Sequence, residues 1–208
     1  MKVVLVNGSP NANGCTFTGL SIIKEQLATQ GVESEIFQVG SKPVIGCTAC
    51  RVCKQPGKAG SCVFDDDMVN TVAQALREAD GIILGSAVHF ASATGAAVSF
   101  FDRLFYCTEK DAKRLKFGAA IVSCRRGGNS ATFDQLNKYF TISQMPVVSS
   151  CYWNGIHGYK PEDVHADEEG VRILKTLANN MAYLIKCKKQ SNIELPEELS
   201  GTMVNFIR

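Results

Sequence analysis

The sequence lacks any apolar run long enough to cross a bilayer, because its uninterrupted apolar stretches, such as residues 3–6 and 81–85, have only strand length. It also has little excess charge, since 22 Lys and Arg against 20 Asp and Glu give a formal net charge of +2. That balance does not supply the broad basic surface with which proteins grip nucleic acid. We therefore expect neither a membrane nor a nucleic acid among the partners.

The N-terminus has neither the apolar region nor the cleavage site of a secretory signal, so a cytoplasmic protein is expected. The cysteine count of nine is odd, which argues against a closed disulfide framework. A chain of 208 residues with 45% hydrophobic residues predicts one soluble domain with a substantial core. We expect that domain to span residues 1–187, followed by a C-terminal tail at 188–208.

Short β-branched runs alternate along the chain with segments of helical period. The pattern predicts strands at 3–6, 32–39, 81–84 and 117–123, a fifth strand beginning at 147–148, and helices at 19–27, about 66–78, 95–106, 132–140 and about 168–186. Such alternation predicts an α/β fold, a doubly wound five-stranded parallel sheet with helices on both faces. Ligands of these sheets bind beyond the carboxyl ends of the strands, which makes the loops there the candidate site.

The first of these loops, residues 8–16, has two glycines with five residues between them and opens a helix. Free amides at a helix N-terminus favour an anion, and the hydroxyls of Ser9 and Thr16 can add donors. A nucleotide-triphosphate loop needs a lysine after its last glycine, where this chain has Cys15, and a dinucleotide loop needs Gly-x-Gly-x-x-Gly. The loop therefore predicts a monophosphate site, and the alternative is a turn and helix cap without a ligand.

Four cysteines, Cys47, Cys50, Cys53 and Cys62, cluster in the loop after the second strand. In a reducing compartment such clustering points to metal or redox chemistry. Three cysteines at successive threes are spaced like the ferredoxin-type run that holds a [4Fe-4S] cluster, whereas zinc sites more often use two separated pairs. The alternative is a flap of free thiols.

The chain resembles the flavodoxin-like family of NAD(P)H-dependent FMN reductases, in the branch that includes the iron–sulfur flavoproteins. Four parts of the sequence carry the resemblance: residues 8–16, the cysteine-rich loop ending at 62–67, residues 85–90 with 101–105, and residues 125–128. The resemblance implies FMN as cofactor and NAD(P)H as donor, with electrons passing to a quinone, a flavin or another acceptor. One alternative is an iron–sulfur flavoprotein that carries electrons to or from a redox protein. Another is a flavin or phosphate sensor with a cysteine switch.

The resemblance also implies three groups of FMN-binding residues. They are Ser9, Asn11, Asn13, Gly14, Cys15 and Thr16 at the phosphate, Ser86, Ala87, Val88, His89 and Phe90 at the ring, and Ser123, Arg125, Arg126, Gly127 and Gly128 at its pyrimidine side. Cys15 stands where the family usually has Asn, and His89 where it more often has Tyr. His89 is a candidate catalytic proton donor, with a solvated loop residue as the alternative.

The resemblance further implies a homodimer or homotetramer. The apolar segment 100–106 has enough apolar residues to face a partner subunit, and the alternative is that it belongs wholly to the core.

Overall fold

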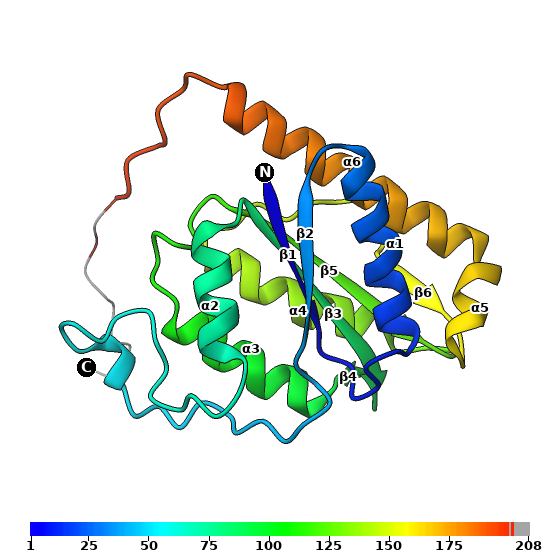
Figure 1. Cartoon of the computed structure of the whole chain (residues 1–208), viewed down its shortest axis with the longest axis horizontal. Coiled ribbons are helices and arrows are strands. Elements are labelled where there is room, and N and C mark those ends of the chain that lie inside the picture. Colours follow the sequence, from blue (N-terminus) through cyan, green and yellow to red (C-terminus); the bar gives the residue numbers. More distant parts are fainter. Residues whose placement is uncertain (200, 202–208) are drawn as a thin grey trace.

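The computed structural model describes residues 1–199 and 201 (Figure 1). The strands are β1 (Lys2–Asn7), β2 (Glu33–Gln38), β3 (Gly81–His89), β4 (Ser92–Ala93), β5 (Phe117–Cys124) and β6 (Gly155–His157). The helices are α1 (Cys15–Thr29), α2 (Val69–Glu78), α3 (Gly95–Cys107), α4 (Asn129–Ile142), α5 (Pro161–Ala166) and α6 (Glu168–Gln190), with a 3-10 turn η1 (Val52–Lys54). No helix in this described part of the chain is long and apolar enough to cross a membrane.

The sheet has the order β2-β1-β3-β5-β6, and all the neighbouring strands in that order run parallel. The short β4 pairs antiparallel with the end of β3. When the parallel strands alone are counted, the order is the 2-1-3-4-5 of flavodoxin-like sheets. The predicted α/β fold with a doubly wound, five-stranded parallel sheet is therefore confirmed.

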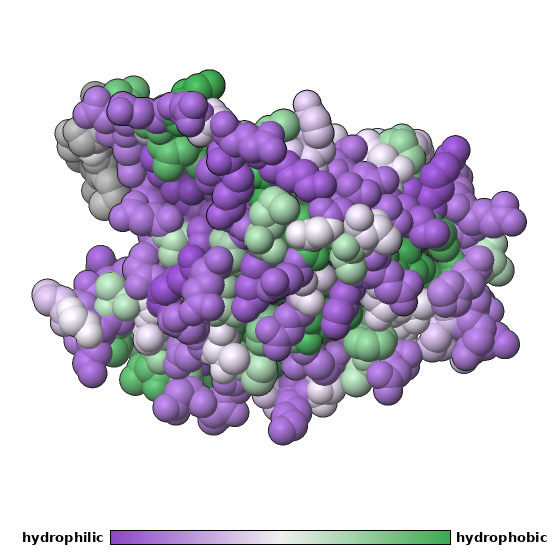
Figure 2. All heavy atoms as spheres, turned by 45° about the horizontal axis from the view of Figure 1, so that its top comes forward, coloured by the Kyte–Doolittle hydropathy of each residue, from purple (hydrophilic) through white to green (hydrophobic). Residues whose placement is uncertain are grey.

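Helices cover both faces of the sheet because successive strand residues point to opposite sides. Val4 and Val6 pack into one core with α2, α3 and α4, and Val3 and Leu5 pack into the other with α1, α5 and α6. Both cores are continuous and buried, and Figure 1 shows the two helical layers on either side of the strands. On the face drawn in Figure 2, hydrophobic side chains form small separate groups among hydrophilic ones.

The last parallel strand lies later in the chain than the β-branched pair at 147–148 predicts. Val147 makes one isolated bridge to Gly118, and the ladder resumes only at β6. Between them the buried Asn154 side chain donates to the Ala120 carbonyl at 3.0 Å, so a side chain replaces the strand there. The predicted position of the fifth strand was therefore wrong by several residues.

The segment after residue 84 is a hairpin, where the sequence pattern predicted a loop. Small side chains let β3 continue to His89, and β4 folds back from it. The two turn residues, Phe90 and Ala91, have φ values of 51° and 57°, which is the geometry of a tight two-residue hairpin. Helix α2 begins at Val69, later than predicted, because Asp67 accepts from the Val69 amide at 3.0 Å instead of entering the helix.

Candidate functional site

A cavity of about 400 Å³ opens at the carboxyl edge of the sheet. It lies among the loops that follow β1, β3, β5 and β6, where parallel sheets bind ligands. Ten of the residues predicted to bind FMN line it: Ser9, Asn11, Gly14, Cys15, Thr16, Ala87, Val88, His89, Ser123 and Arg125. The structure thus brings together residues that lie more than one hundred positions apart in the sequence.

Residues 8–16 are organised by their own side chains. The Ser9 amide donates to Asn7 Oδ1 at 3.2 Å, the Asn11 amide to Ser9 Oγ at 3.2 Å, and the Asn13 amide to Asn11 Oδ1 at 3.1 Å. Each bond joins residues two apart, the Asx and Ser turn pattern that fixes a loop locally. Gln38 at the end of β2 adds a bond from Nε2 to the Ser9 carbonyl at 2.8 Å. The loop therefore has a defined shape without a ligand.

The first turn of α1 is open to an anion. Gly14 at the N-cap supplies no capping side chain, and in residues 1–199 and 201 no acceptor meets the amides of Thr16 and Phe17. The buried Thr16 Oγ1 and Ser123 Oγ lie 2.7 Å apart, so a second hydroxyl from β5 faces the same point. The positive end of the helix dipole lies at this first turn, and these donors suit a phosphate group.

The thiol of Cys15 adds no negative charge at this position. Burial raises the pKa of the Cys15 thiol above its ordinary value, so the group stays protonated at neutral pH. Burial also raises the pKa of Cys124, which lines the same cavity. The two thiols are therefore neutral, the carboxylates of Asp163 and Glu162 act on Cys15 from α5, and Arg125 adds a positive charge at the cavity wall.

The β3–β4 hairpin and the loop after β5 pack tightly against each other. Gly128 has a φ of +87°, and a Cβ there would lie 2.8 Å from the Ala91 Cα, so only glycine fits. Thr94, which follows β4, donates from Oγ1 to the Gly8 carbonyl at 2.7 Å. The hairpin is therefore tied to both the phosphate-type loop and the loop after β5.

The remaining predicted residues do not line the cavity: Asn13, Ser86, Phe90, Arg126, Gly127 and Gly128. Ser86 is buried under the hairpin, where its Oγ accepts from the Thr94 amide at 3.1 Å. Phe90 lies at the hairpin tip, where its side chain is fully exposed. Ser86 and Gly128 therefore support the hairpin and its contact with the loop after β5 and do not line the cavity.

The cavity also includes residues just after β6 that the predicted set of FMN-binding residues did not contain. Gly158, Tyr159 and Pro161 line it, and the Tyr159 ring lies 5.9 Å from the Arg125 guanidinium carbon. The amides of Tyr159 and Lys160 donate to Asp163 and lower the pKa of that carboxyl. Pro161 in the first turn, with acidic residues after it, was the available signal, because it marks a helix start at the sheet edge.

A second cavity gathers the cysteines of the long loop. Cys47, Cys50, Cys53 and Cys62 all line a space of about 20 Å³, together with Cys107 of α3. All five thiols are free, and burial raises the pKa of Cys107 to about 11. In the described residues no three His, Cys, Asp or Glu side chains converge closely enough for a single metal ion.

Arg103 of α3 holds this loop in place from its buried position. Its Nε donates to Cys62 Sγ at 3.3 Å, its Nη2 to the Phe64 carbonyl at 2.8 Å, and its Nη1 to the Ile45 carbonyl at 3.3 Å. The same guanidinium forms an ion pair with Asp67. Sequence reasoning missed both Arg103 and Cys107, although their spacing of four puts them on one face of a helix.

Helix α3 separates the two cavities. Thr94 caps its first turn by accepting from the Ala97 amide at 3.2 Å, and Thr94 also contacts the loop after β1. Cys107 ends the helix at the cysteine cavity. Thirteen helical residues at 1.5 Å each place the two ends about 20 Å apart. The candidate cofactor cavity and the cysteine cavity are therefore separate sites in one chain.

Comparison with known proteins agrees with this architecture. An iron–sulfur flavoprotein of Methanocaldococcus jannaschii is 30% identical over 197 residues, which cover 91% of this chain and all of that protein. The structure of RosB with bound 8-demethyl-8-formylriboflavin-5'-phosphate has a TM-score of 0.72 at 12% identity, covering 100% of this chain and 92% of RosB. The structure of a flavodoxin from the domain Archaea has a TM-score of 0.60 at 18% identity, covering 89% of this chain and 99% of that flavodoxin.

These structural likenesses show a flavodoxin-like fold. The family model described as NADPH-dependent FMN reductase matches residues 1–159, which include the whole of the predicted phosphate loop and most of the cavity. The chain belongs to the NADPH-dependent FMN reductase family, a family of oxidoreductase flavoproteins.

Proposed function

We propose that the chain binds FMN in the cavity at the carboxyl edge of the sheet and passes electrons from NAD(P)H to a small-molecule acceptor such as a quinone or a flavin. The open first turn of α1 carries this proposal. It offers amide donors at Thr16 and Phe17, with the hydroxyls of Thr16 and Ser123 beside them. A phosphomonoester is the part of FMN that such a set of donors fits.

Other residues of the cavity would contact the flavin ring, place a charge beside it and donate a hydrogen bond or proton. Residues 87–89 of the hairpin would lie along the flavin ring, and Arg125 would place a positive charge beside it. His89 lies exposed at the cavity, where its imidazole can donate a hydrogen bond to the flavin or a proton to a reduced substrate. Bound FMN supplies the hydride and electron chemistry, and the protein supplies binding and orientation.

Binding of FMN should be compared with binding of riboflavin, which has the same ring and no phosphate. We expect FMN to bind at least about tenfold more tightly, because charge-assisted bonds to the phosphate are lost with riboflavin. Inorganic phosphate should compete with FMN. Equal affinities for the two flavins would contradict the proposed phosphate site, and tight FMN binding without turnover by NADH or NADPH would favour a sensor.

A second candidate function is electron transfer through an iron–sulfur cluster, with a redox protein as partner. The grouping of five cysteines in one cavity favours it, and the relative from M. jannaschii is named an iron–sulfur flavoprotein. Each thiolate of a [4Fe-4S] cluster binds a different iron, so the sulfurs need not converge on one point. The donors fit in kind and grouping, but the space of about 20 Å³ requires the loop to open around the cluster.

Iron and acid-labile sulfide should be counted per chain after anaerobic purification. We propose Cys47, Cys50, Cys53 and Cys62 as ligands and expect about four irons. Cys62→Ser should lose iron, whereas Cys187→Ser, at an exposed cysteine of α6, should keep it. Absence of iron in the unaltered protein would remove this candidate and leave the FMN reductase proposal standing.

We also propose a homodimer or homotetramer. The apolar segment 100–106 does not supply the interface, because Phe100, Phe101, Leu104 and Phe105 are buried in the core of the chain. Exposed aromatic residues lie elsewhere, with Tyr159 lining the cofactor cavity and Phe90 at the tip of the hairpin that contributes to it. Sedimentation equilibrium tests the proposal, and a monomer at micromolar concentration would contradict it.

A further inference from the structure

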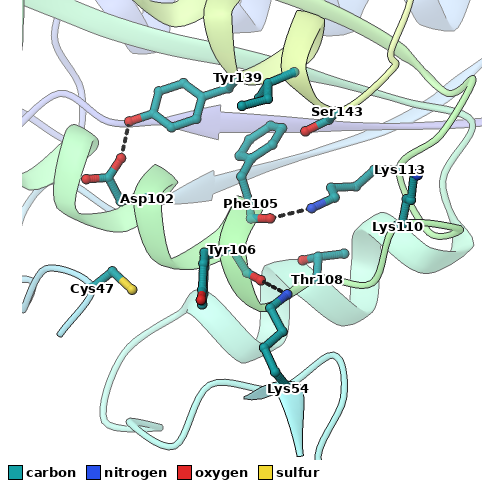
Figure 3. Close-up of a pocket in the computed structure, with 11 residues that line it drawn as sticks. Cys47, Lys54, Asp102, Phe105, Tyr106, Thr108, Lys110, Lys113, Tyr139 and Ser143 are labelled. Atoms are coloured by element: carbon teal, nitrogen blue, oxygen red, sulfur yellow. Dashed lines mark hydrogen bonds between the residues drawn. The ribbon is translucent and has the colours of Figure 1, made fainter. Parts of the chain in front are cut away.

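A cavity of about 500 Å³ lies beside the cysteine loop, at the end of α3 far from the proposed FMN cavity (Figure 3). It shares no lining residue with the proposed FMN cavity. Phe105 and Tyr106 of α3 and Tyr139 and Ile142 of α4 supply an aromatic and aliphatic wall. Its size lies in the range of small-molecule sites.

Three lysines face this cavity, and two of them have no carboxylate partner. The buried Lys113 ammonium donates to the Phe105 carbonyl, and Lys54 Nζ donates to the Tyr106 carbonyl at 2.5 Å (Figure 3). In the described residues neither lysine forms an ion pair, whereas Lys110 pairs with Glu198. The lysines therefore bond to carbonyls of the last turn of α3 and have no carboxylate within ion-pair distance among the described residues.

In this arrangement the Lys113 ammonium is partly desolvated. Burial, and next the charge of Lys54, lower the pKa of Lys113 to about 8, which reflects the cost of that charge. The carboxylate of Asp102 lines the opposite side of the cavity, where it accepts a bond from Tyr139 Oη at 2.6 Å (Figure 3). The Glu109 carboxylate offsets part of the Lys113 charge from beyond ion-pair distance, and a bound anion near Lys54 and Lys113 would add to that compensation.

We propose that this cavity binds a small planar aromatic carboxylate, with its ring against Phe105 and Tyr139 and its carboxylate toward Lys54 and Lys113. The aromatic wall favours a flat apolar ring over an inorganic anion. The unpaired ammonium groups favour a carboxylate over a neutral ring. Glu198 of the chain's own C-terminal segment already brings a carboxylate to Lys110, so this chemistry is accommodated at the cavity.

Two consequences follow from what surrounds the cavity. Cys47 and Tyr106 line both this cavity and the cysteine cavity, so a bound ring would contact the cysteine loop. Glu198 would compete with the ligand's carboxylate, because it pairs with Lys110, one of the three lysines that line the cavity. The ligand and the C-terminal segment are therefore expected to oppose each other.

Calorimetric titration of the full chain with 2-naphthoate tests the proposal, with 2-naphthamide as the neutral probe of the same shape. The titration is made with and without saturating FMN, so binding in the flavin cavity is told apart from binding here. We expect naphthoate to bind at least about tenfold more tightly than naphthamide, equally with and without FMN. Equal affinities for the two probes, or loss of naphthoate binding when FMN is present, would overturn the proposal.

Substitutions at exposed residues test whether naphthoate binds in this cavity, and they leave the hydrophobic core unchanged. Lys54→Gln should weaken naphthoate binding about tenfold, and Ile142→Glu, at a side chain that is 85% exposed, should abolish it by placing a carboxylate in the wall. Glu198→Gln should strengthen binding about twofold. Lys175→Gln, at an exposed position of α6, is the matched control and should change nothing. Unchanged affinity in both Lys54→Gln and Ile142→Glu would overturn the proposal.

Discussion

Residues 8–16 are held largely by bonds between residues two apart, with single bonds added from Gln38 and Thr94, whereas residues 40–65 are held in place by side chains from two helices. In the first loop, Ser9 and Asn11 each accept an amide two residues further on. In the second, Asn70 of α2 bonds both the amide and the carbonyl of Cys62 at 2.7 and 3.0 Å, and Arg103 of α3 bonds its sulfur. One loop is organised locally and the other from outside.

The difference predicts different behaviour on binding. A loop that is already ordered loses little entropy when an anion binds, which favours a tight phosphate site. The cysteine loop is mostly exposed, and Ala49 and Arg51 hold positive φ values of 54° and 61° without being glycine. Its shape therefore depends on a few contacts from the core, and it is expected to open at low free energy.

The largest effect is expected from the removal of Arg103, which tests whether contacts from the helices hold the cysteine loop in place. Arg103→Met leaves the Asp67 carboxylate without its buried partner, so we expect the free energy of unfolding to fall by about 3–5 kcal/mol. The control is Arg77→Met, which breaks the more exposed pair with Glu109 and should cost about 1 kcal/mol or less. Urea unfolding measures both. Equal losses would mean that Arg103 does not specially hold the loop.

Loss of one hydroxyl at the phosphate loop should have a smaller effect, and its readout is the affinity for FMN. Thr16→Ala removes the partner of Ser123 and a donor to the anion, so we expect FMN to bind about tenfold more weakly. Thr29→Ala, at the exposed far end of α1, should leave the affinity unchanged. Fluorescence titration of FMN gives both values. The phosphate position proposed here is wrong if the two variants bind FMN alike.

Buried charge should make stability near the cysteine loop depend on pH. Folded Lys113 has a pKa of about 8, against an ordinary value of 10.5. Between these values the unfolded chain binds more protons, so this residue makes the free energy of unfolding rise with pH. Lys113→Met removes that rise, so the stability of the variant relative to the unaltered chain should fall between about pH 8 and 10.5. A constant difference in urea titrations would contradict the lowered pKa.

The smallest effect is expected at the C-terminal segment. Glu198→Gln breaks the pair with Lys110, but both side chains are substantially exposed. We therefore expect the free energy of unfolding to change by less than about 0.5 kcal/mol. Urea unfolding checks this, and a loss above about 1 kcal/mol would show that the segment is part of the folded core.

The sequence was sufficient wherever the signal is local. The glycine and hydroxyl pattern of residues 8–16 predicted a helix start with free amides, and the open amides of Thr16 and Phe17 lie there, whereas the anion itself stays a prediction. The alternation of short strands and helices predicted the sheet and its two covered faces. Helix and strand ends were less accurate, because the ends depend on single side chains such as Asp67, which bonds the Val69 amide ahead of α2.

Features that depend on contacts between distant segments could not be predicted in this way. The Asn154 side chain replaces part of a strand because it reaches the Ala120 carbonyl, 34 residues away in sequence. Arg103 and Cys107 meet the cysteine loop only because α3 packs beside it. Tyr159 reaches the cofactor cavity through the position of α5. None of these contacts leaves a periodic signal in the sequence.

The most direct test of the central claim is anaerobic mixing of the FMN-loaded chain with NADH or NADPH, followed by the visible absorption of the flavin. If the chain is an NAD(P)H-dependent FMN reductase, about one equivalent of one donor should bleach the oxidised flavin, and an added quinone should restore it. If the chain binds FMN but the flavin stays oxidised with both donors, the proposed reductase function is contradicted.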